Sequence, residues 1–156
     1  MTADMLELLR VRRSCRTYTS RAIKKETLND IIRGVLLSPS SRRRNPWEFI
    51  VIDQPDVLQQ LSCSKEHGSA FLKDAPAAVV VLGIPELSDV WVEDTSIASI
   101  LIQLTAQSLG VGSCWIQIRQ RKLSPELSSA DYVRQILNIP SGHSVESIIS
   151  LGYPAE

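Results

Sequence analysis

Two segments near the start of the chain place several arginines beside serine, a combination suited to binding an anion. The first carries Arg12, Arg13, Ser14 and Arg16 after a short apolar stretch, and the second covers residues 39–49. Guanidinium groups do not lose their charge, so a dense group of them repels itself unless an anion shares the space. Serine hydroxyls and free backbone N–H groups commonly bind phosphate oxygens. Both segments are therefore candidate sites for an anionic ligand.

In the second segment, Ser40 and Ser41 precede the consecutive arginines Arg42, Arg43 and Arg44. A short basic run is weak evidence by itself, because nucleic-acid or heparin patches contain such runs too. Here the run lies between a predicted helix and a predicted strand and has a proline on each side. Loops held by regular elements are where binding sites are built. For the first segment the alternative is a solvated turn, since arginine is favoured at helix C-termini.

The charge of the chain is distributed unevenly. Its 156 residues carry no net charge, but residues 1–44 hold eleven Lys and Arg against four Asp and Glu. The remaining residues hold six against thirteen, so the basic part is confined to the first third. This distribution indicates a localised anion site. A binding module for nucleic acid or another polyanion is the alternative, and the acidic remainder and the few aromatic residues count against it.

The composition excludes several other classes of protein. The start of the chain does not read as a secretory signal, and no apolar run reaches the roughly 18 residues that a membrane span needs. Cys15, Cys63 and Cys114 are widely spaced, and the chain has two histidines. This pattern argues against a disulfide framework and against a zinc site. We expect a cytoplasmic protein with no membrane part and no metal.

Hydrophobic periodicity predicts a single layered domain over residues 1–156, of the α/β or α+β class. The segment 92–109 is apolar on nearly every face, so we expect a long central helix that is buried all round. A second subunit would make this burial easier in so small a domain, so we expect a homodimer. In the first helix, Leu6 and Leu9 are expected to point inward. The predicted helices are residues 5–11, 25–37, 55–61, 92–109 and 131–137, and the predicted strands are 47–53, 77–83, 111–118 and 144–151.

Several motifs together resemble the nitroreductase family of FMN-dependent oxidoreductases. Each is weak alone, but their shared order over essentially the whole chain is specific. The motifs are RRSCR (12–16), PSSRRRNPWEF (39–49), APAAVVV (75–81), DTSIA (94–98), LGVGSCW (109–115) and LGYPAE (151–156).

The resemblance implies an α+β homodimer with a layered sheet, flanking helices and two FMN sites, each built from both subunits. The first segment would hold the FMN phosphate, ribityl chain and pyrimidine edge. The second would lie along the flavin ring from the partner subunit, and the glycine turn near residue 112 would pass the ring, where a missing side chain lets the backbone approach. The implied FMN-binding residues are Arg12, Arg13, Ser14, Arg16, Pro39, Ser40, Ser41, Arg42, Arg43, Gly112 and Ser113.

The resemblance also implies the reaction. NAD(P)H, as co-substrate, would give a hydride to the flavin and leave, and a nitroaromatic, quinone or similar conjugated acceptor would then take the electrons. No catalytic side chain is then required. Arg16, with Arg42 as second choice, is expected to stabilise the negative charge of the reduced ring electrostatically. The alternative within the same fold is a flavin-binding sensor, storage protein or degenerate member without turnover.

The chain departs from the family pattern at two loop positions and at its end. The family usually has asparagine where Arg43 stands and glutamine where Asn45 stands, and many relatives continue past Glu156 with a basic tail. We expect these differences to alter the contacts with FMN. We expect ordinary roles for four further residues: Asp94 begins a helix, His67 lies in a polar loop, Cys114 is a small buried residue, and Trp47 packs in the core and does not face a substrate.

Overall fold

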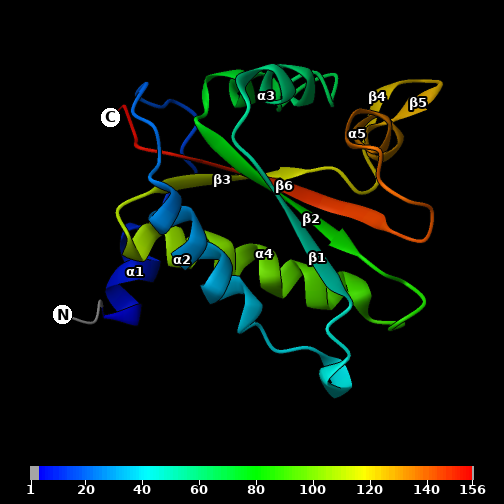
Figure 1. Ribbon diagram of the computed structural model, residues 1–156, viewed down its shortest axis with the longest axis horizontal. Helices are drawn as coiled ribbons and strands as arrows, with labels where there is room; N and C mark the ends of the chain where they lie inside the picture. Colours follow the sequence, from blue (N-terminus) through cyan, green and yellow to red (C-terminus); the bar gives the residue numbers. More distant parts are fainter. Residues whose placement is uncertain (1–3, 156) are drawn as a thin grey trace.

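A central antiparallel sheet organises the computed structural model, which describes residues 4–155 (Figure 1). Its strand order is β1 (Trp47–Ile52), β2 (Ala77–Gly83), β6 (Ser144–Gly152) and β3 (Gly112–Gln117). Each neighbouring pair of strands is antiparallel. All four predicted strands are therefore confirmed within one residue at each end, and the α+β class of the fold is confirmed.

Helices cover both faces of the sheet (Figure 1). One face carries α1 (Met5–Val11), α2 (Lys25–Leu36) and α4 (Trp91–Ser108), and the other carries α3 (Pro55–Leu61) and α5 (Ser129–Leu137). All five helices were predicted. The structure adds two 3-10 turns and a hairpin beside α5 that the periodicity did not indicate, because such short segments bury little apolar surface. These are η1 (Ser41–Arg43), η2 (Ala70–Asp74), β4 (Lys122–Ser124) and β5 (Leu127–Ser128).

Local backbone chemistry sets several helix ends. Helix α3 starts with Pro55, whose fixed φ suits the first helical position. Helix α5 starts after Ser128, whose Oγ accepts a hydrogen bond of 3.0 Å from the Asp131 N–H. The same helix ends at Asn138, which adopts the left-handed conformation with φ of 52°. These boundaries need no tertiary contact to explain them.

Strand β2 separates two apolar cores. All seven of its residues are buried, as its uninterrupted apolar sequence predicted. Val79 and Val81 pack with α2 and α4, whereas Val80 and Leu82 pack beneath α3 and α5. Because side chains alternate between the faces of a strand, one apolar run serves both layers.

Helix α4 contacts the sheet through a stripe of polar side chains. Thr95, Ser99 and Gln103 are spaced four residues apart, so they share one face of the helix. Thr95 Oγ1 lies 3.1 Å from a carboxylate oxygen of Glu146, and Ser99 Oγ lies 2.9 Å from Ser147 Oγ. Gln103 Nε2 donates to Ser113 Oγ at 3.2 Å. The hydrogen bonds orient α4 and join it to β6 and β3.

Two expectations about burial are wrong for the single chain. Helix α4 is not buried all round, because Ile97 is 40% exposed on the side away from the polar stripe. Leu6 and Leu9 of α1 do not point inward, since they are 67% and 52% exposed and α1 buries none of its side chains. Within residues 4–155 no element covers α1 and the outer face of α4 on this side. No helix of the described residues is long and apolar enough to cross a membrane.

Glu146 is a buried carboxylate at a β-bulge. Val81 pairs with Ser147 and Leu82 with Val145, so Glu146 is the extra residue between two register positions. Burial raises the pKa of Glu146, while the Thr95 hydrogen bond and the Arg119 guanidinium, with Nε at 3.8 Å, act in the opposite direction. The protonated form is therefore favoured more strongly in the folded chain than in the unfolded one.

Glu146→Gln should remove a pH dependence of stability. Since the folded-state pKa lies above the unfolded value, the folded chain binds more protons in the window between them, and the free energy of unfolding falls as pH rises through it. Glutamine does not titrate, so urea unfolding of the variant at pH 5, 6.5 and 8 should show a smaller fall than the wild type. Glu126→Gln, on the exposed connection between β4 and β5, is the matched control. The same pH slope in Glu146→Gln and wild type would contradict this role.

Candidate functional site

The first basic turn, residues 12–16, lies against the edge strand β3. Ser14 pairs with Ser113 in an isolated parallel bridge, and the Cys15 N–H donates to the Ser113 carbonyl at 2.8 Å. A Cβ atom at Gly112 would lie 2.9 Å from Pro154 Cγ and 3.1 Å from Cys15 Cβ, so a side chain there would push the turn away. Gly112 thus has a structural role in the approach of this turn to the sheet.

A cavity of about 320 Å³ opens beside the first basic turn. Arg13, Ser14 and Arg16, three of the residues predicted to bind an anion, line it from the turn, whereas Arg12 does not. Gln107 of α4 and Pro154 of the C-terminal segment also line it, and neither was predicted. A signal for Pro154 existed in the LGYPAE motif, whereas nothing in the sequence near Gln107 pointed to a cavity.

The arginines of the first basic turn have different environments. Arg13 Nη1 donates to the carbonyl oxygens of Arg10 and Arg12, at 2.7 and 2.8 Å, and so caps the end of α1. This contact matches the helix-end alternative. By contrast, the Arg12 and Arg16 side chains make no hydrogen bond or ion pair within residues 4–155. Arg16 therefore brings an unneutralised charge to the cavity.

Ser113 and Cys114 support the site from the sheet. Ser113 is buried and bonds to both α4 and the first basic turn, so its hydroxyl and its carbonyl already have protein partners. Cys114 is buried, which confirms the expected small apolar role. Burial raises the pKa of the Cys114 thiol, and the nearby Arg16 guanidinium acts in the opposite direction. The Arg16 charge thus lies close to the buried end of β3.

The second basic turn, residues 39–45, is closed by its own hydrogen bonds. Ser40 Oγ donates to Asn45 Oδ1 at 2.7 Å, and the Asn45 N–H donates back to Ser40 Oγ at 2.9 Å. Arg42, Arg43 and Asn45 have φ of 55°, 54° and 47°, in the left-handed region that costs a non-glycine residue on the order of 1–3 kcal/mol. The side chains of Ser40 and Asn45 are thereby used to hold this backbone.

Asp94 anchors the second basic turn to α4. It lies in the first turn of the helix, as predicted, and it is 3% exposed. Asp94 Oδ1 accepts a hydrogen bond of 3.1 Å from the Ser41 N–H, while Oδ2 is buried without a partner among the described residues. Arg44 adds a second link, because its Nη1 donates to the Leu87 carbonyl at 3.2 Å. Sequence analysis missed this anchoring role, which joins residues 53 positions apart.

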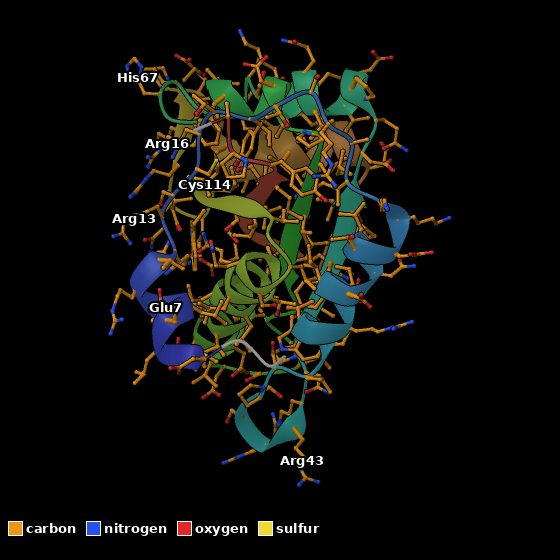
Figure 2. The ribbon with its side chains drawn as sticks, turned by 90° about the vertical axis from the view of Figure 1, so that its left-hand side faces the viewer. Glu7, Arg13, Arg16, Arg43, His67 and Cys114 are labelled. Atoms are coloured by element: carbon orange, nitrogen blue, oxygen red, sulfur yellow. The ribbon has the colours of Figure 1, made fainter. Side chains whose placement is uncertain are left out.

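The two basic turns lie at opposite ends of α4. The first is next to Gln107 and the second next to Asp94, which are about 20 Å apart along the helix axis at the usual helical rise. Figure 2 shows the same separation, with Arg13 and Arg16 on one side of the molecule and Arg43 at its far tip. A single chain therefore does not bring the two groups of predicted site residues together.

Other candidate residues have ordinary surroundings. His67 is exposed in the loop after α3, with Nε2 3.6 Å from a Glu66 carboxylate oxygen, which confirms the polar-loop interpretation. Trp47 is buried in the core. In the part of the chain that the structure describes, no three His, Cys, Asp or Glu side chains are grouped to hold a metal ion.

Asp94→Ala should loosen the second basic turn. Loss of the carboxylate leaves the Ser41 N–H without its partner, which should lower the free energy of unfolding by about 1–3 kcal/mol. Trypsin, which cleaves after arginine, should then cut within residues 42–44 faster than in the wild type. Glu93→Ala, an exposed neighbour on the same helical turn, should change stability by less than about 0.5 kcal/mol. Wild-type rates of cleavage in Asp94→Ala would show that this anchor is unimportant.

Comparisons with known proteins agree with this architecture. The model of the Nitroreductase family matches residues 9–66 and 54–153. A protein of Archaeoglobus fulgidus with the provisional name NADH dehydrogenase/NAD(P)H nitroreductase is 37% identical, over 98% of this chain and 87% of its own length. One of Methanothermobacter thermautotrophicus with the same provisional name is 35% identical, over 98% and 78%.

A known structure is similar over almost the full chain. It is an FMN-dependent nitroreductase of Clostridium difficile R20291, with a TM-score of 0.95 and 45% sequence identity. The similarity covers 97% of this chain and 88% of that one. With a family match over most of its length and relatives above 30% identity, the chain belongs to the nitroreductase family of oxidoreductases.

Proposed function

We propose that this chain is a single-domain, FMN-dependent NAD(P)H oxidoreductase that works as a homodimer. The observation that carries the proposal is the unneutralised Arg16 beside a cavity at the edge of the sheet. The FMN dependence of the similar Clostridium difficile protein supports the choice of cofactor. The names of the archaeal relatives support NADH or NADPH as the electron donor.

The residues around the cavity fit FMN chemically. Arg13 and Ser14 line the cavity and Arg12 precedes them in the chain, so the three residues offer cations and a hydroxyl for a phosphate group. The close packing at Gly112 lets the turn lie against β3. We assign the phosphate to these residues and the electron-rich edge of the ring to Arg16. FMN would supply a ring that accepts hydride from NAD(P)H and passes electrons to an acceptor.

A twofold dimer would complete each site from both subunits. Leu6 and Leu9 of α1 and Ile97 of α4 are exposed, and both helices lie on the same face of the sheet (Figure 1). In a twofold interface each subunit uses the same surface, and with the axis perpendicular to α4 the two α4 helices would run in opposite directions. The first basic turn of one subunit would then meet the second basic turn of the other. We propose that Pro39, Ser40, Ser41 and Arg42 reach the flavin in this way, whereas Arg43 lies beside the site without contacting FMN.

The chain's own contribution to the reaction is electrostatic and positional. A fixed guanidinium at Arg16 would stabilise negative charge that develops on the ring, without any proton transfer from the protein. Substrates would bind in turn: NAD(P)H loses a hydride and leaves as NAD(P)⁺, and the acceptor then takes that hydride and a proton. A quinone would become a quinol by this exchange. Nitroaromatics and other conjugated acceptors are suited to the same transfer.

Absorbance of the purified protein tests the proposal directly. We expect flavin bands, either as isolated or after addition of FMN, and loss of the band near 450 nm on anaerobic titration with NADH or NADPH. Addition of a quinone or nitroaromatic should then restore the band. Protein that cannot bind FMN would refute the proposed function. Flavin that binds but is not reduced would favour the sensor or storage alternative.

Arg16→Ala should weaken both the binding and the reduction of FMN. Loss of one charge-assisted hydrogen bond predicts an increase in the FMN dissociation constant of about tenfold or more, measured by flavin fluorescence. Stopped-flow reduction by NADH should also slow, and Arg16→Lys should recover part of both effects because it retains the charge. Arg33→Ala, which removes an exposed arginine of α2, is the control. Unchanged affinity and reduction in Arg16→Ala would rule out the assigned role.

A further inference from the structure

The second basic turn carries more positive charge than its own fold uses. Arg44 bonds to the Leu87 carbonyl and so has a structural role. Arg42 and Arg43 are exposed, and within residues 4–155 their side chains make no hydrogen bond and no ion pair. Two guanidinium groups on adjacent residues are thus exposed without an anionic side chain of the described residues as a partner.

The turn is held in place despite its unfavourable backbone. Three non-glycine residues of this turn lie in the left-handed region, and the Ser40–Asn45 and Asp94–Ser41 hydrogen bonds keep them there. Strain of this kind persists where the surroundings impose it and is common at binding sites. The exposed arginines are therefore presented from a fixed position, which lowers the entropy that a ligand contact would cost.

The location of the turn indicates what Arg43 can reach. Arg43 lies at the tip of the molecule and points away from its own subunit (Figure 2). The turn follows Leu37, which is 84% exposed, so it borders apolar surface that a second subunit would cover. In the proposed dimer this tip would lie beside the other subunit's cavity. The first basic turn of that subunit would already bind the FMN phosphate, so the charge of Arg43 is free for another anion.

We propose that Arg43 selects substrates that carry an anionic group, a phosphate or a carboxylate, within its reach. The inference rests on the proposed function and adds a substrate class to it. Two substrates offer this chemistry: the 2′-phosphate of NADPH on the donor side, or a carboxylate on the electron acceptor. A guanidinium suits either group, because its planar N–H groups can bind two oxygens at once.

Matched substrate pairs test the proposal and identify the source of the anion. kcat/KM is measured for NADPH and NADH with one neutral quinone, and for 4-nitrobenzoate and 4-nitrobenzyl alcohol with NADH. In Arg43→Gln we expect about a tenfold loss of kcat/KM for either NADPH or 4-nitrobenzoate, the members that carry the additional anionic group. The kcat/KM for neutral acceptors should change less than twofold. Arg43→Lys should retain part of the preference. Lys122→Gln makes the same change of charge on the remote β4–β5 hairpin and should leave both ratios unchanged.

Three results would overturn the proposal. Equal losses for both members of a pair, or a weaker FMN affinity in Arg43→Gln, would make Arg43 a flavin ligand. Unchanged ratios in both pairs would show that it selects no anion. A wild-type protein that binds FMN but does not oxidise NAD(P)H would contradict the proposed function instead. In that case Arg43 can still be tested by binding. 4-Nitrobenzoate and 4-nitrobenzyl alcohol are titrated into FMN-loaded wild type and Arg43→Gln, and binding is followed by flavin absorbance. Wild-type protein that binds the carboxylate more tightly than the alcohol, with the difference lost in Arg43→Gln, would support the proposal.

Discussion

The hydrogen bonds between α4 and the sheet are the constraint on which the rest of the molecule depends. Thr95, Ser99 and Gln103 are buried polar side chains, and a buried polar group that loses its partner costs about 1–3 kcal/mol. Their partners, on β6 and β3, are therefore required to stay in register with the helix. Rotation of α4 about its axis would break all three contacts at once.

The orientation of α4 decides where the two basic turns lie and which surface remains exposed. The polar stripe faces the sheet, so the apolar side chain of Ile97 is left on the outside. The C-terminal end of the helix brings Gln107 to the first basic turn, and its N-terminal end brings Asp94 to the second. An exposed apolar face with a cationic turn at each end is a suitable surface for the proposed twofold association, which would pair unlike ends if its axis were perpendicular to α4.

The arginines of the N-terminal third fall into two groups, those that bond to backbone carbonyls and those without a partner in the described part of the chain. Arg13 and Arg44 donate to backbone carbonyls and hold the ends of local structure. Arg16 and Arg43 have no such partner in the described part of the chain and remain able to bind anions. Density of positive charge singled out the two segments that lie at the ends of α4, but it did not distinguish a guanidinium that bonds to its own chain from one that does not. That distinction depends on which carbonyl groups lie within reach.

The sequence by itself determined the five helices and the four strands of the central sheet, and the order in which they occur. Uninterrupted apolar residues predicted β2, the three-four spacing predicted α2, and the ordered motifs indicated the family, because these signals are local or linear. Only the tertiary structure determined the Asp94–Ser41 hydrogen bond, the bulge at Glu146 and the polar face of α4. It also determined the separation of the two basic turns, which is about 20 Å along α4. These features join residues distant along the chain, and their geometry depends on how the layers pack. The sequence predicted that α4 is apolar on nearly every face, whereas the packing of the layers determined which face lies against the sheet.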